Sequence, residues 1–234
     1  MFLGLWRRRE ELLISLQQEL IGPSYLQALD VTATTAREVL KDFITKMGGL
    51  DLIVISVSPY HDISKSYSLR SLNYELMLSR APWEEKRRVI DVCLTGFIAL
   101  ADVAFEFFGV QKRGHFVGIS SSSGLRANSL FPYQAAKACI SRYMEGARNN
   151  FAAQGIPIQV TDVIPGYVAV EHSPQGADPN AYWEVTCEQA GEDIMNGIKD
   201  QKEVVYVPGR VRLIAWLLQW MPDWLYNKYF HWLP

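Results

Sequence analysis

Tyr133 and Lys137, four residues apart, are the side chains of this sequence best suited to acid–base chemistry. Residues at this spacing lie on the same face of a helix. An ammonium beside a phenol favours the phenolate and lowers the pKa of tyrosine from about 10, which allows proton exchange near neutral pH. The spacing alone is weak evidence, because two exposed residues of a surface helix would show it equally well.

A serine-rich segment precedes this pair. Residues 120–123 are all serine, Gly124 follows them, and the apolar residues 116–119 come immediately before. A short apolar run of this kind predicts a strand. A serine hydroxyl at the end of that strand is suited to holding a substrate oxygen close to the phenol of Tyr133.

The elements that must position these residues alternate along the chain. Hydrophobic periodicity predicts helices at residues 12–20, 39–47, 83–108, 133–151 and 188–199, and strands at residues 1–6, 25–29, 52–57, 116–119, 156–164 and 203–207. Alternation of this kind indicates a parallel sheet covered by helices on both faces. We therefore expect an α/β fold with a doubly wound parallel sheet in a single domain. The β-branched run 52–57 is typical of a strand buried on both faces.

Composition narrows the range of functions. The 234 residues carry a formal net charge of −2 and are 49% hydrophobic, which suits one globular domain and gives no reason to expect nucleic acid as a partner. Three scattered cysteines do not make a disulfide framework, so a reducing, cytoplasmic location is expected. Cys139 is expected to be a small buried residue rather than a nucleophile. The four histidines show no ligand spacing, so no metal site is expected.

Together with a later run, these residues resemble a known family. Residues 120–124, Tyr133, Lys137 and the run Pro165-Gly166-Tyr167-Val168 have the order and spacing of the short-chain dehydrogenases/reductases. Segments 30–32, 50–54, 96–97 and 114–121 also match, and the resemblance covers residues 3 to 207. It implies that the doubly wound sheet is Rossmann-like. It also implies a nicotinamide cofactor and hydride transfer between its C4 and a carbonyl or alcohol carbon of a small substrate.

The resemblance also assigns catalytic roles. Tyr133 would give or take the proton, Lys137 would lower the tyrosine pKa and bind the nicotinamide ribose, and Ser121 would orient the substrate oxygen. Ser121 lies three residues before Gly124, as the family serine lies before its glycine. Its separation from Tyr133 is one residue shorter than usual, so Ser120 is the alternative.

A further set of residues is assigned by resemblance to the cofactor site. Besides Tyr133 and Lys137, this set contains Arg8, Asp30, Val31, Ser56, Pro165, Gly166 and Val168. Asp30 and Val31 belong to the family's adenine pocket. Arg8 follows a strand at the point where an arginine would pair with the 2′-phosphate of NADP, whereas a carboxylate would bind the ribose of NAD. A guanidinium suits a phosphate dianion, so NADP is expected in preference to NAD; a solvated basic turn is the alternative.

The sequence also departs from the family. No strand with a glycine-rich turn and helix precedes the element that matches the family's second strand, so about 30 residues are expected to be missing before Met1, through a misplaced start or a truncated gene. We then expect unpaired strand edges and no measurable dinucleotide binding by residues 1–234 alone. Ser58 replaces a glycine near the adenine, and Cys93 replaces an asparagine whose backbone holds a water in the proton relay.

The domain assigned to residues 1–209 is followed by a tryptophan-rich tail at residues 210–234. Trp216, Trp220 and Trp224 recur every four residues in a helix expected to break near Pro222, and polar residues interrupt it too often for a membrane span. The tail is either an amphipathic surface for a partner subunit or membrane interface, or a segment packed onto its own domain. Residues 171–187 fall where the family has its substrate-covering loop, with Tyr182 and Trp183 as candidate lid residues.

Two functions remain open at this point. The first is an NADP-preferring oxidoreductase that acts as a homo-oligomer on a small carbonyl or alcohol substrate. The second is a degenerate family member that keeps the fold without turnover and acts by association with a protein or a membrane surface.

Overall fold

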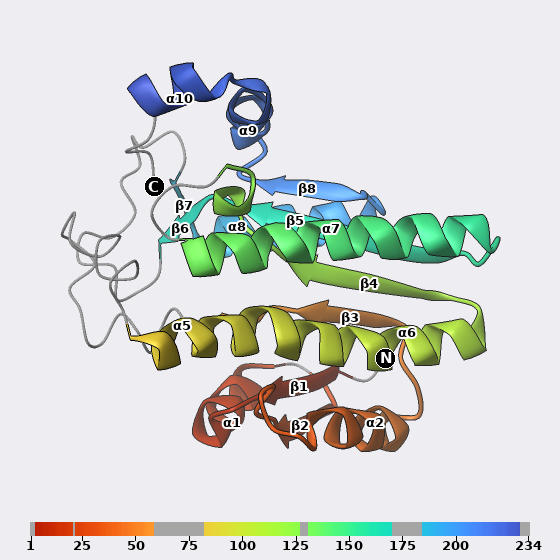
Figure 1. Cartoon of the computed structure of the whole chain (residues 1–234). Coiled ribbons are helices and arrows are strands. Elements are labelled where there is room, and N and C mark those ends of the chain that lie inside the picture. The colour runs from red at the N-terminus through yellow and green to blue at the C-terminus, as the bar shows by residue number, and fades with distance from the viewer. Residues whose placement is uncertain (1–2, 21, 59–81, 127–130, 170–183, 230–234) are drawn as a thin grey trace.

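The computed structural model describes residues 3–20, 22–58, 82–126, 131–169 and 184–229, and Figure 1 shows how their elements are arranged. Strands and helices alternate along the chain, as the hydrophobic pattern predicts. The elements are β1 (Leu3–Arg7), α1 (Glu10–Glu19), β2 (Ser24–Ala28), α2 (Ala36–Met47), β3 (Leu52–Ile55), α5 (Trp83–Ile90), a π-helical turn (Asp91–Gly96), α6 (Phe97–Gln111), β4 (Gly114–Ile119), a 3₁₀ turn (Ser122–Gly124), α7 (Phe131–Ala153), β5 (Ile158–Pro165), β6 (Tyr167–Ala169), β7 (Glu184–Thr186), α8 (Cys187–Lys199), β8 (Val204–Val207), α9 (Val211–Trp220) and α10 (Asp223–Tyr229).

The strands of the described segments pair only in parallel. Four of them form the main sheet in the order β3-β4-β5-β8, while β1 pairs with β2 and β6 pairs with β7 in two smaller sheets. A parallel pair needs a crossover connection, and helices supply it between the strands of the main sheet and between β1 and β2. The α/β fold with a parallel sheet is therefore confirmed.

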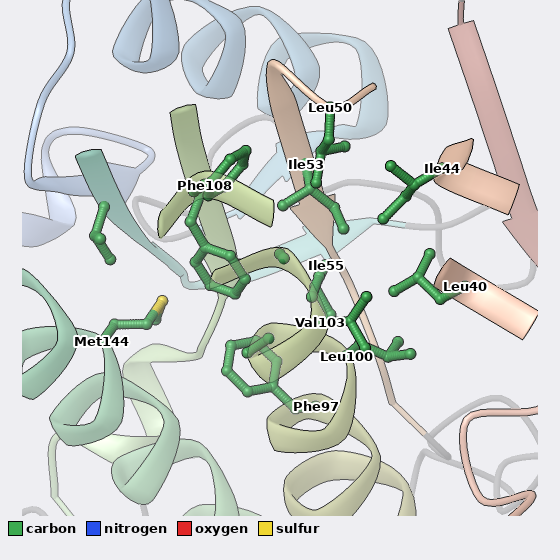
Figure 2. Packing of buried hydrophobic residues seen from close by; sticks show 14 of the residues in the cluster. Leu40, Ile44, Leu50, Ile53, Ile55, Phe97, Leu100, Val103, Phe108 and Met144 are labelled. Atoms are coloured by element: carbon green, nitrogen blue, oxygen red, sulfur yellow. The ribbon is translucent and has the colours of Figure 1, made fainter. Parts of the chain in front are cut away.

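Helices cover both faces of the main sheet. Phe116 and Val117 are neighbours on β4, and they lie in two different buried clusters because successive strand residues point to opposite faces. On one face, Phe97 of α6 and Met144 of α7 belong to the larger cluster (Figure 2), and the Phe97 and Phe116 rings meet edge to face with centroids 5.8 Å apart. On the other face, Val117 shares its cluster with Ile198 of α8. The doubly wound arrangement is thus confirmed at the centre of the sheet.

One expectation about burial is wrong. In β3, Ile53 and Ile55 are buried, but Leu52 is 41% and Val54 is 40% exposed. The described helices cover this edge strand on one face only, so the run 52–57 is not buried on both faces. A β-branched sequence shows that a strand is favoured, but it does not show which of its faces another element covers.

The segment predicted as one helix at 83–108 is interrupted. Between α5 and α6 the backbone forms a π-helical turn at Asp91–Gly96, which contains Cys93. A π turn inserts one extra residue into a helix and is frequently found at functional sites. The residues packed around Cys93 in this turn are therefore candidates for a functional site.

Candidate functional site

The candidate residues gather at one edge of the main sheet. Because β3, β4 and β5 are parallel, their carboxyl ends at Ile55, Ile119 and Pro165 lie at the same edge. In α/β sheets this is the edge at which ligands bind. The first turns of α7 bring Tyr133 and Lys137 to it.

Lys137 lies at the centre of this arrangement. Its side chain is only 2% exposed, and Nζ donates hydrogen bonds to the backbone oxygens of Ile119, at 2.8 Å, and of Val57, at 3.2 Å. The same Nζ lies 5.7 Å from the centroid of the Tyr133 ring. Lys137 therefore connects α7 to the chain at the ends of β3 and β4, and its charge lies beside the phenol of Tyr133. It does not belong to a solvated helix surface.

Burial and the neighbouring groups shift the pKa of Lys137 in opposite directions. Loss of hydration lowers the pKa of Lys137, while the nearby Cys93 and Asp162 act in the opposite direction. An ammonium has three N–H donors, and two of them are used by the carbonyls of Val57 and Ile119. The described residues supply no acceptor for the third donor, which could therefore bind an oxygen of a ligand.

The two candidate serines lie in different environments. Ser120 is 2% exposed, and its hydroxyl lies 2.5 Å from Oδ1 of Asp162 and 3.1 Å from the backbone oxygen of Val163. Ser121 is half-buried, and its Oγ accepts a hydrogen bond from the backbone N–H of Ser123 and contacts the Ser123 hydroxyl at 2.8 Å. Ser120 is thus directed to the core between β4 and β5, whereas Ser121 begins the turn at the sheet edge.

Gly124 lets this turn pack closely on the helix that carries the Tyr/Lys pair. A Cβ at Gly124 would lie 2.8 Å from the backbone nitrogen of Ala138, directly after Lys137 in α7. Backbone atoms cannot move aside as a flexible side chain can, so a larger residue would displace the turn. This contact explains why a glycine three residues after Ser121 helps to set the position of that serine.

Cys93 lies inside the π-helical turn and is fully buried. Burial raises the pKa of its thiol to about 11, against a smaller opposing effect of the Lys137 charge. At neutral pH the side chain is therefore a thiol rather than a nucleophilic thiolate. A role for this position near Lys137 must come from its backbone or its size.

The adenine-side candidates form a second group, at the ends of β1 and β2. Oδ1 of Asp30 accepts hydrogen bonds from the backbone N–H of Thr32 at 2.9 Å and from its hydroxyl at 2.7 Å. These bonds, and to a smaller extent the charges of Arg8 and Arg88, lower the pKa of Asp30. Arg8, an exposed residue after β1, and Arg88 of α5 therefore lie near this carboxylate; the sequence pattern gave no reason to select Arg88.

Val31, the next residue, contacts the helix that contains Cys93. A Cβ at Gly96 would lie 2.7 Å from Cγ2 and 3.0 Å from the backbone oxygen of Val31. Gly96 therefore allows the loop after β2 to approach the π-helical turn closely. This contact connects the adenine-side candidates to the helix beside Lys137.

The remaining cofactor candidates follow β3 and β5. Ser56 is exposed directly after β3, and Pro165 ends β5. The backbone N–H of Gly166 donates to the oxygen of Val207 at 2.7 Å, and Val168 in β6 pairs with Val185 in β7. The lid candidates Tyr182 and Trp183 lie outside the described residues.

The exposure of Cys139 contradicts an expectation from the sequence, and the burial of Asp162 was not predicted. Cys139 is exposed, so the expectation that it is buried is wrong. It lies two residues after the buried Lys137, and a two-residue step along a helix turns by about 200°, to nearly the opposite face. Asp162 is 4% exposed inside the apolar strand β5, and burial raises its pKa although Ser120, Ser141, Arg148 and Lys137 act to lower it. A lone acid within a β-branched run was the available signal.

The described segments show neither a metal-binding cluster nor a membrane-spanning helix. They contain no group of three His, Cys, Asp or Glu residues placed to hold a metal ion. No helix in them has both the length and the apolar character needed to cross a bilayer.

Comparison with known proteins gives consistent matches. The family model described as short chain dehydrogenase matches residues 5–179. An uncharacterized oxidoreductase of Myxococcus xanthus is 32% identical over 145 residues, which are 61% of this chain and 51% of that protein. A second uncharacterized oxidoreductase, from Streptomyces coelicolor, is 30% identical over 122 residues, or 51% of this chain and 47% of that protein. The chain thus spans about half the length of the curated relatives it matches.

Solved structures show the same fold at lower sequence identity. A 7beta-hydroxysteroid dehydrogenase superposes with a TM-score of 0.75 at 18% identity, over 98% of this chain and 86% of that one. A short-chain dehydrogenase from Streptomyces avermitilis gives 0.68 at 18% identity, over 97% and 88%. A 3-ketoacyl-ACP reductase from Sinorhizobium meliloti gives 0.67 at 17% identity, over 91% and 90%.

Proposed function

We propose that this chain, which belongs to the short-chain dehydrogenase family, carries the catalytic residues of an NADP-dependent oxidoreductase. The proposed reaction interconverts a small carbonyl compound and an alcohol. One observation carries the proposal. The buried ammonium of Lys137 is held by the backbone oxygens of Val57 and Ile119, with the Tyr133 ring beside it. Burying a lysine is costly, and a role in binding and proton transfer accounts for this cost.

Tyr133 is the proposed proton donor in carbonyl reduction and the acceptor in alcohol oxidation. The phenol is half-buried at the start of α7, at the edge where the parallel strands end. The Lys137 charge favours its anionic form, because an opposite charge in a poorly hydrated site stabilises the ion. Proton transfer by a positioned side chain contributes roughly 10²–10⁴-fold to a rate.

Ser121 is the proposed hydrogen-bond donor to the substrate oxygen. Its hydroxyl lies at the start of the turn that packs on α7 through Gly124. Ser120, the alternative, hydrogen-bonds to Asp162 and Val163 in the core. These contacts support Ser121 over Ser120, because a hydroxyl engaged in the core cannot at the same time orient a substrate at the sheet edge.

The family's nicotinamide cofactor fits the residues at this edge. When bound, the nicotinamide supplies or accepts the hydride. The third N–H of Lys137 would bind its ribose, and Pro165, Gly166 and Val168 would line its ring, since they follow the end of β5. Cys93 would contribute a backbone oxygen of the π-helical turn to the proton path, because such turns alter the regular hydrogen-bond pattern of a helix.

The proposed preference for NADP rests on the cations at the other end of the site. Arg8 and Arg88 both act on Asp30, so two guanidinium groups lie close to the proposed adenosine pocket of Asp30, Val31 and Ser56. A guanidinium binds a phosphate dianion with charge-assisted hydrogen bonds. The 2′-phosphate distinguishes NADP from NAD, and this pair of cations would favour it.

We also place this activity in the cytoplasm and in a homo-oligomer. The three cysteines, including the exposed Cys139 and Cys187, are free thiols, which suits a reducing compartment. The oligomeric state follows from the family resemblance, and the molar mass of the purified protein in solution tests it.

The test of the function is carbonyl-dependent oxidation of NADPH by the full-length gene product, including any in-frame residues encoded before Met1. A panel of small aldehydes and ketones, with 2,3-butanedione as a reactive probe, should contain substrates. We expect consumption of NADPH to depend on the carbonyl and to be faster than consumption of NADH at equal concentration. Tight NADPH binding without turnover of any carbonyl or alcohol would contradict the proposal and favour an inactive family member.

A further inference from the structure

Helix α9 has apolar side chains on every side. Of its ten residues, only Arg212 and Gln219 are polar. Val211 and Ala215, one helical turn apart, are buried against the domain. A helix that is apolar all round is normally covered all round, but here one face is left exposed.

The exposed apolar side chains lie on α9 and on the following helix α10. They are Leu213, Trp216, Leu217, Trp220 and Trp224, which are 74%, 60%, 52%, 74% and 69% exposed. The first four follow the helical spacing of three and four residues on the side opposite Val211 and Ala215. We call these five side chains the tryptophan face.

The tryptophan face is large for a surface in contact with water. A tryptophan brings about 150–250 Å² of side-chain surface, so the three tryptophans at these exposed fractions together expose roughly 300–500 Å², and the two leucines add to this area. Patches of this size on a monomer are often functional. The chemistry of the face indicates which kind of partner it suits.

Contacts with the domain hold this segment in place, so its exposure is not due to a loose tail. Arg126 donates to the backbone oxygen of Met221 at 3.1 Å and pairs with Asp223 at 2.5 Å. The same guanidinium lies 4.6 Å from the centroid of the Tyr226 ring, and Met221 and Tyr226 are buried. Figure 1 shows α9 and α10 together at one end of the molecule, beyond β8.

We propose that the tryptophan face binds the surface of an anionic lipid bilayer, with α9 lying in the plane of the interface. Tryptophan is enriched at the boundary between headgroups and hydrocarbon, because its ring is apolar and its N–H is polar. Ten residues span about 15 Å, half of the hydrocarbon thickness, so α9 lies on the bilayer and does not cross it.

The charges around the face select an anionic surface. Residues 210–229 contain three exposed basic side chains, Arg210, Arg212 and Lys228, and one acidic side chain, Asp223, in a chain whose formal net charge is −2. Asp223 is paired with Arg126, and Arg210 donates a hydrogen bond to the backbone oxygen of Glu184 at 2.8 Å. The cytoplasmic leaflet is negatively charged and attracts basic groups that flank an inserted apolar face.

A second copy of the chain is a less suitable occupant. A stable protein interface involves about 20–30 residues on each partner, whereas the tryptophan face consists of five. Interfaces of that kind also rely on close shape complementarity, whereas a lipid surface adapts to separate protruding tryptophans.

Co-sedimentation of the full chain with vesicles tests the proposal. Wild-type protein should pellet with mixed phosphatidylcholine–phosphatidylserine vesicles, and its tryptophan emission should shift to shorter wavelength and be quenched by brominated lipid. The triple variant Trp216→Ser/Trp220→Ser/Trp224→Ser should lose at least about tenfold in partitioning. Arg212→Gln should lose about fivefold on anionic vesicles and little on pure phosphatidylcholine.

Trp83→Ser is the matched control, because Trp83 is 68% exposed but lies on α5. This variant should pellet as the wild type does, and circular dichroism should show that all variants are folded. Failure of the wild type to bind anionic vesicles, or equal binding by the triple variant, would overturn the proposal. A dimer in the analytical ultracentrifuge that the triple substitution converts to monomer would overturn it too, because the face would then be a subunit contact.

Discussion

The hydroxyl of Ser120 and the carboxyl of Asp162 form a buried hydrogen bond across the neighbouring strands β4 and β5, with Oγ 2.5 Å from Oδ1. The next residue, Ser121, contacts Ser123 in the turn at the sheet edge instead. Of these two adjacent serines, Ser120 therefore stabilises the core, and Ser121 lies at the edge of the sheet where the reaction is proposed. The same carboxyl acts on Lys137 through its charge, so the core bond and the proposed site are linked.

The two serines should respond differently to alanine substitution. Ser120→Ala removes a donor from a buried acid and should lower the free energy of unfolding by about 1–3 kcal/mol, while the carbonyl reductase rate changes little. Ser121→Ala should leave stability nearly unchanged and lower the rate at saturating NADPH. Urea unfolding and the NADPH assay, run on both variants, measure the two effects; a reversed pattern would assign the substrate contact to Ser120.

Asp162 should make the stability of the protein depend on pH in an unusual direction. Burial raises its folded-state pKa above the ordinary value of 3.8, so the folded chain binds more protons than the unfolded chain in the interval above about pH 4. The contribution of this group to stability is therefore present below that interval and falls as the pH rises through it. Asp162→Asn cannot ionise, and its stability relative to wild type should increase between about pH 4 and pH 7.

Chemical unfolding of both proteins across this pH range is the measurement for Asp162. The asparagine can still accept a hydrogen bond from Ser120, which makes it a conservative replacement. A stability difference that stays constant with pH would show that the carboxyl ionises in the folded protein as it does in the unfolded chain. A difference that decreases as the pH rises would show that folding lowers its pKa, and either result would contradict the prediction.

The three cysteines should differ in their reaction with iodoacetamide. Cys93 is buried and its thiol pKa is raised to about 11, whereas Cys139 and Cys187 are exposed. Because the thiolate is the nucleophile, the native protein at pH 8 should be modified at the two exposed positions only. Mass spectrometry of proteolytic fragments reads each site, with urea-unfolded protein as the control in which all three react. Rapid labelling of Cys93 in the native state would contradict the burial of the π-helical turn.

Arg8 should set the preference for NADPH. Arg8→Ala in the full-length gene product should weaken NADPH binding by about tenfold to a hundredfold and leave NADH binding nearly unchanged. Arg7→Ala, at an exposed basic residue one position earlier, is the matched control and should affect the two cofactors equally. Calorimetric titration gives both dissociation constants, and an unchanged ratio in Arg8→Ala would remove the 2′-phosphate role from this residue.

Local sequence patterns predicted most elements of the fold because those patterns reflect burial on one helix face or strand. The helix that ends at Gly48, the strand before Ser120 and the break at Pro222 are all found in the structure. The short strands β6 and β7 were not predicted, because three residues are too few for a periodic signal. The exposed face of β3 was missed because it depends on what packs against the strand.

The candidate site was predictable only in part for the same reason. The spacing of Tyr133 and Lys137 placed them on one helix face, but the carbonyl contacts of Lys137 come from β4 and from the residues after β3. Asp162 of β5 acts on Lys137 of α7, and Arg88 of α5 acts on Asp30, which follows β2. No local pattern encodes such contacts between segments that are distant in the sequence.

The central claim is that Tyr133 transfers the proton in a nicotinamide-dependent reaction, and Tyr133→Phe tests it most directly. The full-length gene product and this variant are compared in carbonyl-dependent oxidation of saturating NADPH, with NADPH affinity measured separately. Tyr143→Phe is the control on the same helix, since the Tyr143 hydroxyl donates to Asp102 away from the strand ends. We predict a rate roughly 10²–10⁴-fold lower for Tyr133→Phe, unchanged NADPH affinity, and a nearly normal rate for Tyr143→Phe. A rate for Tyr133→Phe within a few fold of wild type would contradict the account.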